Sequence, residues 1–123
     1  MRATLAALIA GGMVVTAAAA VDATHQDPIR GKAVYYSNAY AGETMACGGK
    51  YQPWKMVAAH RRLPCGTELR VRNRANGRVV KVTVRDRGPY GDKDVKLDLS
   101  RRAARKLRFI KKGVTRIRAV RLH

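Results

Sequence analysis

Val84-Arg85-Asp86-Arg87-Gly88-Pro89-Tyr90 is the most informative segment of the chain, because it joins an apolar strand to a sharp turn. Residues 80–84 alternate valine with polar side chains, which predicts a half-buried β-strand that leads directly to Asp86. The Gly88-Pro89 pair then predicts a turn. We therefore expect the Asp86 carboxylate at the end of a strand, where a groove can expose it.

A second carboxylate, Asp98, lies in the apolar segment Lys96-Leu97-Asp98-Leu99-Ser100. The chain has 26 lysine and arginine residues but only 8 aspartate and glutamate residues. Two acids placed at the ends of apolar segments therefore indicate a site rather than solubilising charge, and Glu43 ranks third. Two structural alternatives stay open, in which Asp86 caps its turn and Asp98 is a buried carboxylate bound by backbone N–H groups.

Further alternating segments predict a sheet around the first strand. Residues 68–73 alternate apolar and basic side chains, Asn76-Gly77 predicts a hairpin turn, and residues 78–85 form the partner strand. The outward stripe of arginine and lysine on this pair is either a solvated face or a polymer-binding surface. Other short strands are expected over 32–36, 56–59 and 114–122, with a glycine-rich loop over 37–54.

Ser100 predicts the N-cap of a helix. Apolar residues from Ala103 to Ile110 follow at helical spacing, and the helix is expected to end before Gly113. About six short strands and one helix in about 100 residues predict an all-β fold. A small barrel fits best, because closure removes the exposed edges of a sheet.

The first 20 residues have the features of a signal peptide, with a basic n-region, an apolar run over 5–15 and the small-residue cleavage signal Ala18-Ala19-Ala20. Cleavage after Ala23 is an alternative. The apolar run is too short to predict a membrane span. A lipid anchor is not expected, because there is no cysteine near the cleavage point. We expect a periplasmic or secreted monomer, with a flexible lead over 21–30 and one domain over 31–123.

Cys47 and Cys65 are the two cysteines of the chain. In an oxidising compartment such a pair in a small domain predicts a disulfide. The alternative is a nucleophilic or metal-binding cysteine, but His25, His60 and His123 are scattered without ligand spacing. We expect neither a metal nor another cofactor.

The formal net charge of +18 at pH 7 predicts binding to anionic polymers. Nucleic acid is the usual partner of so basic a chain, but export argues against it. Cell-wall polymers, lipopolysaccharide and anionic membrane surfaces are the expected partners.

Several motifs, taken in order, resemble the rare lipoprotein A (RlpA)-like family of double-psi β-barrel proteins. They are Ala-Ala-His-Arg-Arg-Leu-Pro-Cys-Gly-Thr at 58–67, Val-Arg-Asp-Arg-Gly-Pro-Tyr at 84–90, and the shorter matches at 31–36, 39–42, 71–73, 97–100 and 103–104. The resemblance implies a six-stranded double-psi β-barrel with one short helix. It also implies a secreted or envelope lytic transglycosylase, which cleaves the MurNAc–GlcNAc β-1,4 bond of peptidoglycan glycan strands and leaves 1,6-anhydro-MurNAc ends.

The resemblance also implies functional residues. Asp86 falls at the family's catalytic aspartate, His60 at its accompanying histidine, and Asp98 at a groove aspartate of the related expansins. Met45 and Gly49 depart from the family, which often has threonine and glutamate at these two positions.

A lytic transglycosylase needs fewer carboxylates than an ordinary glycosidase, because the C6 hydroxyl of the muramic sugar is the attacking group. One carboxyl group can donate a proton to the leaving oxygen and then accept one. For Asp86 this role requires a raised pKa, which burial or an ionised Asp98 favours and Arg87 opposes. We expect Arg87 to point elsewhere or to grip the substrate.

Tyr40, Trp54 and Tyr90 are further candidates for substrate binding, the first two as stacking platforms for sugars. Two other functions stay open. The paired cysteines are similar to those of secreted expansin and barwin barrels, several of which bind glycans without cleaving them, so one alternative is a non-catalytic wall-binding or wall-loosening barrel. The other is a cationic protein that binds polyanions by charge alone.

Overall fold

The computed structural model describes residues 27–122 of the chain. The expected signal peptide over 1–20, its alternative cleavage point after Ala23 and most of the expected lead lie outside the described residues. In chain order the elements are β1 (Ile29–Tyr35), η1 (Asn38–Tyr40), β2 (Val57–Ala59), β3 (Glu68–Asn73), β4 (Val79–Asp86), β5 (Val95–Leu99), α2 (Arg101–Lys106) and β6 (Thr115–Arg121). No helix in this part of the chain is long and apolar enough to cross a lipid bilayer.

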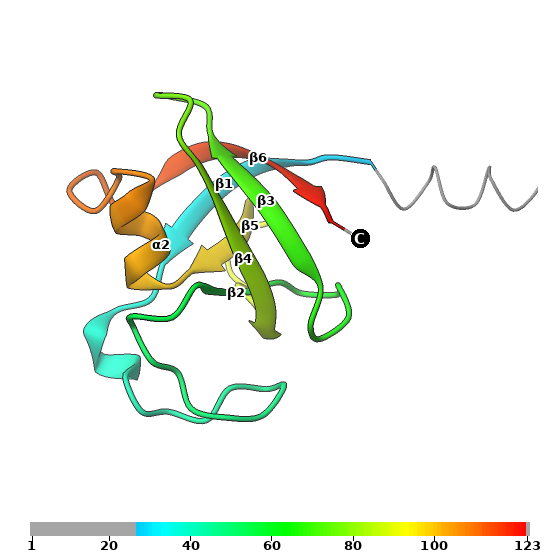
Figure 1. Cartoon of the computed structure of the whole chain (residues 1–123), viewed down its shortest axis with the longest axis vertical. Helices are drawn as coiled ribbons and strands as arrows, with labels where there is room; N and C mark the ends of the chain where they lie inside the picture. The colour runs from blue at the N-terminus through cyan, green and yellow to red at the C-terminus, as the bar shows by residue number, and fades with distance from the viewer. Residues whose placement is uncertain (1–26, 123) are drawn as a thin grey trace, which may run out of the picture.

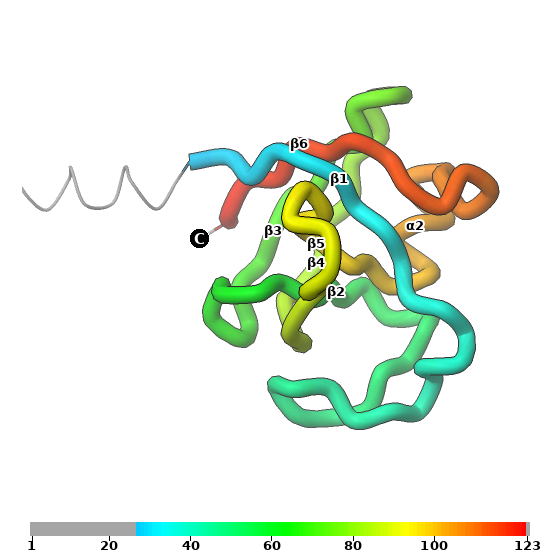
Figure 2. Tube along the Cα trace, turned by 180° about the vertical axis from the view of Figure 1, so that it is seen from behind, coloured from blue at the N-terminus to red at the C-terminus, as the bar shows by residue number. Residues whose placement is uncertain are grey.

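The six strands of the described chain close into a barrel in the order β1-β5-β2-β4-β3-β6 (Figure 1). β1 runs parallel to β5 and β2 runs parallel to β4, whereas the other four neighbouring pairs are antiparallel. The view from behind shows α2 on one side of the barrel (Figure 2). The expected all-β barrel of six strands with one short α-helix is confirmed.

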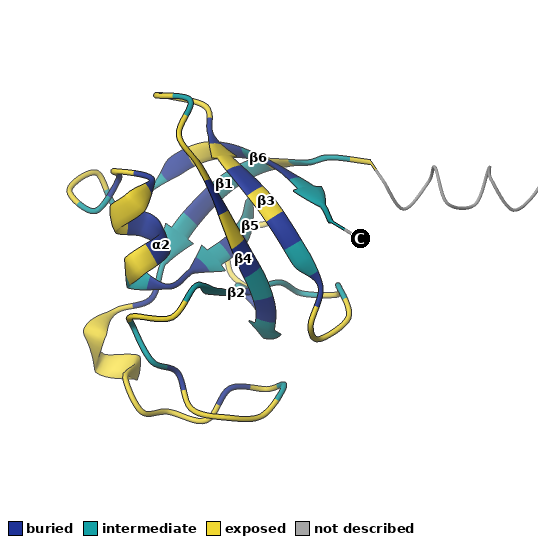
Figure 3. Ribbon diagram, viewed as in Figure 1, coloured by how far each residue is buried: buried dark blue, intermediate teal, exposed yellow. Residues whose placement is uncertain are grey.

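Alternating side chains of β3 and β4 fill the barrel. Leu69 and Val71 lie opposite Val82 and Val80, and all four are almost fully buried. The alternating buried and exposed bands along both strands are visible in Figure 3. The predicted pairing of these two strands across a hairpin is therefore confirmed, and so is the outward position of their basic residues.

Strand β1 begins at Ile29, earlier than the strand expected over 32–36, so its first residues fall within the lead expected over 21–30. Ile29 lies opposite Ala119 and Gly31 opposite Ile117 in the antiparallel ladder with β6. Pairing with β6 therefore extends β1 to residues that precede the apolar segment from which the strand was predicted.

Helix α2 has Ser100 as its N-cap, as expected, because the Ser100 Oγ accepts a hydrogen bond from the N–H of Ala103 (3.3 Å). The helix is shorter than predicted. It ends at Lys106, whereas the spacing of apolar residues predicted a helix that continues almost to Gly113.

The early end of α2 has a local cause. Arg108 adopts a left-handed conformation (φ 59°), and the N–H of Phe109 donates to the carbonyl of Ala104 (3.2 Å), as in a Schellman C-cap. The side chain of Asn73 also donates to the carbonyl of Leu107 (2.8 Å). Glycine usually takes the left-handed position, so an arginine there gave no stop signal in the sequence.

The long segment between β1 and β2 extends beyond the end of the barrel at which β4 finishes (Figure 1). Its buried side chains belong to a second small core, separate from the core of the barrel, formed by Tyr36, Met45, Tyr51 and Ala59. A folded platform thus covers the end of β4, where Asp86 lies.

Cys47 and Cys65 form a disulfide, as expected. The bridge joins the segment between β1 and β2 to the turn before β3. The N–H of Cys47 also donates to the carbonyl of Arg85 (3.0 Å), next to Asp86. The bridge therefore fixes this segment against the end of β4.

We expect the double variant Cys47→Ser/Cys65→Ser to lower the free energy of unfolding by about 3 kcal/mol, because the bridge closes a loop between residues 18 positions apart and restricts the unfolded chain. Urea unfolding followed by circular dichroism measures the difference. The wild-type chain treated with a reducing agent is the matched control and should unfold at the midpoint of the variant. Equal midpoints for the variant and the oxidised wild type would contradict the expectation.

Candidate active site

Asp86 is the last residue of β4, and its carboxylate accepts three hydrogen bonds. Oδ1 accepts from the backbone N–H groups of Ala46 (2.8 Å) and Arg87 (2.9 Å), and Oδ2 accepts from the hydroxyl of Tyr36 (2.5 Å). The bond from Arg87 is a local turn contact, but the other two donors come from distant parts of the chain, so Asp86 does more than cap its turn.

Tyr36 connects Asp86 to the second core. Its ring stacks on Tyr51, with the ring centroids 4.4 Å apart and the planes inclined by 22°. Burial and the hydrogen bond to Asp86 raise the pKa of the Tyr36 hydroxyl well above its usual value. Tyr36 therefore stays protonated and donates its hydrogen bond to Asp86 throughout the neutral pH range.

Asp98 lies in β5 and is more deeply buried than an ordinary carboxylate. Burial, and secondarily the charge of Asp86, raise the pKa of Asp98 to about 7. Within the described chain no donor reaches its buried Oδ1 atom. The structure therefore does not show the alternative in which backbone N–H groups satisfy this atom of Asp98, and with a pKa of about 7 the carboxyl group is protonated in about half of the molecules at pH 7.

The topology brings the two aspartates to the same level of the barrel. Strand β2 lies between β4 and β5, and Ala59 is the register partner of both Asp86 and Asp98. Neighbouring strands are separated by about 4.8 Å, so the two backbones are about 10 Å apart across β2. Side chains on the same side of Ala59 can then approach one another.

Both carboxyl groups line a pocket with a volume of about 260 Å³. The pocket lies under the segment between β1 and β2. Polar side chains from several elements share it: Tyr36, Tyr40, Glu43, Asp86, Arg87 and Asp98. Of the residues expected in the site, the structure thus brings together Asp86, Asp98, Arg87 and Tyr40, and it adds Glu43.

His60 follows β2 and lines a different pocket. Its Nδ1 accepts hydrogen bonds from the backbone N–H groups of Arg62 and Leu63 (both 3.0 Å). Burial and the positive charges of Arg61, Arg87, Arg62 and Lys96 lower the pKa of His60, in that order of importance. The imidazole is therefore neutral and shapes the turn after β2, and the backbone N–H of His60 donates to the carbonyl of Asp86 (3.2 Å).

The other predicted binding residues occupy separate positions. Arg87 donates from Nη1 to the carbonyl of His60 (3.1 Å). Trp54 is 61 % exposed and does not line the pocket of Asp86, and Tyr90 is 71 % exposed beside His60. Tyr90 and Trp54 therefore do not line the carboxylate pocket that Tyr40 lines.

Three parts of the site were not predicted from the sequence. They are the hydroxyl of Tyr36, the backbone N–H of Ala46 and the ring of Tyr51. The alternation of side chains at the end of the first strand predicted that either Tyr35 or Tyr36 is buried in the core. This prediction was the only indication in the sequence that Tyr36 points inward. No pattern in the sequence indicates the backbone donor at Ala46, because its position depends on how the loop folds back.

Within residues 27–122, no group of three histidine, cysteine, aspartate or glutamate side chains is arranged to hold a metal ion. Two neighbouring carboxyl groups at one pocket, one of them with a raised pKa, can take part in proton transfer.

A family model described as lytic transglycolase matches residues 29–119, which includes all six strands and both aspartates. The chain belongs to this family. The predicted resemblance to RlpA-like double-psi β-barrels is confirmed.

Curated relatives agree with the lytic transglycolase family. A protein of Aquifex aeolicus named probable endolytic peptidoglycan transglycosylase RlpA is 48 % identical over 86 residues, which are 70 % of this chain and 38 % of that protein. A protein of Nostoc sp. with the same name is 45 % identical over 91 residues, which are 72 % of this chain and 24 % of that protein. The chain thus spans less than two fifths of the length of these two relatives.

Solved structures show the same barrel. A Streptomyces papain inhibitor has a TM-score of 0.64 and 28 % identity, over 79 % of this chain and 96 % of that one. An expansin of Clavibacter michiganensis has a TM-score of 0.63 and 29 % identity, over 79 % of this chain and 51 % of that one. Both similarities support the double-psi β-barrel fold of this domain.

The two departures from the family pattern fall at different places. Met45 is buried and lines the carboxylate pocket, where its side chain belongs to the second core. Gly49 is exposed and is not among the residues lining that pocket, whereas Glu43 of the same segment is. This lytic transglycolase domain therefore has a third carboxylate at its pocket from another position.

Proposed function

We propose that the chain is an endolytic transglycosylase that cleaves the β-1,4 bond between MurNAc and GlcNAc in peptidoglycan and leaves 1,6-anhydro-MurNAc ends. The observation that supports this most strongly is the pair of aspartates at one pocket, of which Asp98 has a pKa of about 7 and Asp86 accepts three hydrogen bonds. The family and the names of the relatives favour the same reaction.

In the proposed reaction the carboxyl pair carries one proton. Asp98 gives its proton to the glycosidic oxygen, and the bond from that oxygen to C1 of MurNAc breaks. The C6 hydroxyl of the same MurNAc forms the new bond to C1 and loses its proton to Asp86. Transfer of that proton from Asp86 to Asp98 restores the starting state, so protons and bonds balance without an added base.

This assignment differs from the expectation that Asp86 is the acid and Asp98 and His60 assist it. Burial favours the protonated form of Asp98, which makes Asp98 the proton donor of the pair, whereas three hydrogen-bond donors hold the Asp86 carboxylate in place. His60 acts on the site through its neighbour Arg87, whose guanidinium is bonded to the His60 carbonyl. We assign His60 a positioning role.

Tyr40 is proposed to contact a sugar face at the carboxylate pocket, because its ring is 53 % exposed there and packs edge-on to Tyr36 at 5.8 Å. The basic surface of the barrel is proposed to hold anionic polymers of the cell envelope near the protein. Action on peptidoglycan implies a periplasmic or extracellular location, and we propose that the domain acts as a monomer.

Digestion of purified sacculi tests the proposal. Mass spectrometry of the released strands should detect 1,6-anhydro-MurNAc ends that accumulate with time. Binding to sacculi without such ends would instead favour a non-catalytic expansin-type barrel. Binding to every polyanion alike, lost steeply as salt is added, would favour a cationic protein that acts by charge alone.

A further inference from the structure

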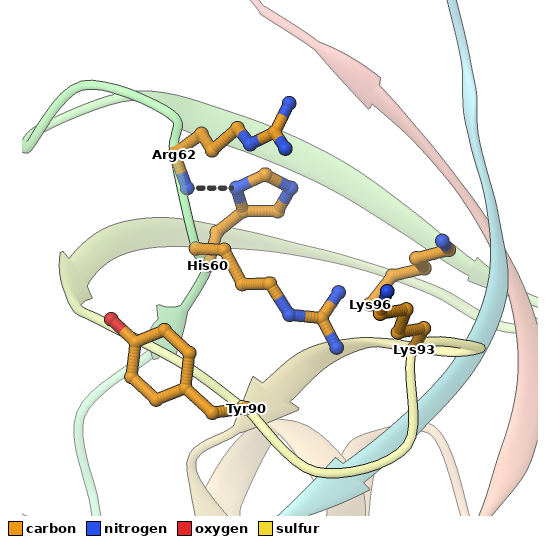
Figure 4. Close-up of a pocket in the computed structure, with 6 residues that line it drawn as sticks. His60, Arg62, Tyr90, Lys93 and Lys96 are labelled. Carbon is orange, nitrogen blue, oxygen red and sulfur yellow. Dashed lines mark hydrogen bonds between the residues drawn. The ribbon is translucent and has the colours of Figure 1, made fainter.

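A second pocket with a volume of about 520 Å³ lies beside the carboxylate pocket. It is lined by His60, Arg61, Arg62, Tyr90, Lys93 and Lys96, and we call it the basic pocket. Four of the six residues are lysine or arginine, and none is acidic. Figure 4 shows Lys93 coming from the segment between β4 and β5, Lys96 from β5, and His60 and Arg62 from the segment after β2.

The acidic residues on either side of Lys93 do not neutralise the basic pocket. The carboxylates of Asp92 and Asp94 each lie 3.8 Å from the Nζ of Lys32, and Asp94 is also 3.4 Å from the Nη1 of Arg116. Across residues 27–122, no ion pair includes any of the four cations of the basic pocket. These positive charges therefore gather in one concave site without an internal counter-ion.

The basic pocket is held in shape by the protein itself. Arg61 donates from Nη2 to the carbonyls of Asp92 (3.0 Å) and Val95 (2.9 Å), which joins the two segments that form the pocket. Burial lowers the pKa of His60 most, and the positive charges of Arg61, Arg87, Arg62 and Lys96 lower it further, which agrees with a positive potential at the pocket. A fixed concave site with that potential attracts an anion.

The basic pocket and the carboxylate pocket lie on either side of the contact between the ends of β2 and β4. The N–H of His60 donates to the carbonyl of Asp86 (3.2 Å), and Arg87, which lines the carboxylate pocket, is bonded to the His60 carbonyl. Adjacent strands lie about 5 Å apart. The basic pocket is therefore within reach of the next units of a polymer that occupies the carboxylate pocket.

We infer that the basic pocket is a binding subsite for a carboxylate carried by the same glycan strand that is cleaved at Asp86 and Asp98. This inference rests on the proposed function. Carboxylates are the acidic groups of peptidoglycan: each muramic acid unit carries one on its lactyl ether when no peptide is attached, and stem peptides carry others. The planar guanidinium of Arg62 and the ammonium of Lys93 suit such a group.

The test measures binding rather than cleavage. Arg62 and Lys93 are exposed, and within the described chain their side chains form no hydrogen bond, so the variant Arg62→Gln/Lys93→Gln should fold. Both substitutions are placed in the Asp86→Asn background to prevent cleavage. Isothermal titration calorimetry then measures affinity for peptide-free glycan strands, for peptide-bearing strands, and for peptide-free strands whose carboxylates have been reduced to alcohols.

We expect affinity for one of the two carboxylate-bearing strands to fall about 10-fold, while affinity for the reduced strand stays unchanged. The matched control is Lys111→Gln/Lys112→Gln, which removes the same charge from exposed positions of the segment between α2 and β6, away from the basic stripe of β3 and β4. A loss confined to peptide-free strands assigns the carboxylate to the lactyl group, and a loss confined to peptide-bearing strands assigns it to the stem peptide.

An equal loss on the reduced strand, or an equal loss in the control variant, would overturn the inference, because shape or net charge alone would then explain the binding. Should the double variant misfold by circular dichroism, the single variants Arg62→Gln and Lys93→Gln provide the same comparison. Failure of the wild-type chain to form anhydro ends would defeat the proposed reaction but leave this binding result standing.

Discussion

The substitution Asp86→Asn is expected to slow the formation of 1,6-anhydro ends by about 10³-fold or more. The amide oxygen can still accept the hydrogen bonds from Ala46 and Arg87, and the amide nitrogen can donate to the oxygen of Tyr36, so the site should keep its shape. The amide cannot accept the proton of the C6 hydroxyl. Initial rates of anhydro-end formation on sacculi, measured by mass spectrometry, give the ratio of the two enzymes.

The matched control for this variant is Glu68→Gln. It also removes one negative charge, but Glu68 lies on β3 and forms only an exposed ion pair with Lys81 (3.9 Å). Its activity should equal that of the wild type. A rate for Asp86→Asn within about 10-fold of the wild type, with unchanged circular dichroism, would show that the carboxylate takes no part in proton transfer.

Asp98 is expected to make the folded protein less stable as the pH rises from about 4 to about 7. Its pKa is raised to about 7 in the folded chain, whereas the carboxyl group of an unfolded chain ionises near its ordinary value of about 4. Below both values the group is protonated in both states and has no effect. At higher pH the unfolded chain releases the proton first, which favours unfolding by up to about 4 kcal/mol above pH 7.

The variant Asp98→Asn should remove this penalty. Its free energy of unfolding should exceed that of the wild type at pH 8 and approach it near pH 4, while its anhydro-end formation is lost with the proton donor. Denaturant unfolding of both proteins across this pH range measures the difference between their free energies of unfolding. Contributions from other titrating groups, such as His60, are the same in both proteins and cancel in this difference. A difference that does not change with pH would show that Asp98 ionises normally in the folded chain.

Much of the barrel was predictable because its strands obey simple local rules. Alternating valines predicted β4, the alternation from Leu69 to Val71 predicted β3, and Asn76-Gly77 predicted the turn between them. The closed barrel and the disulfide were confirmed as well. The end of α2 was missed because it depends on a left-handed arginine and on side-chain contacts from a distant hairpin.

The site was predictable only in part. Asp86 and Asp98 were selected because acids are rare in this chain and these two end apolar segments. The two aspartates both lie beside Ala59 because β2 pairs with β4 in parallel and with β5 in antiparallel orientation. No local sequence pattern encodes these two pairings. For the same reason the sequence did not indicate that Tyr36 would supply a donor, or that His60 would turn its ring toward a separate pocket.

The antiparallel pairing of Ile29 with Ala119 has a practical consequence. It places the first and last strands of the barrel side by side at one end, while Tyr36 and the carboxylate pocket lie at the far end of β1, roughly 20 Å away. An immobilisation tag or a fused module can therefore be attached at either end of the barrel without covering the carboxylate pocket. Such fusions would let the domain be anchored to a bead or sensor surface with its working face directed outward.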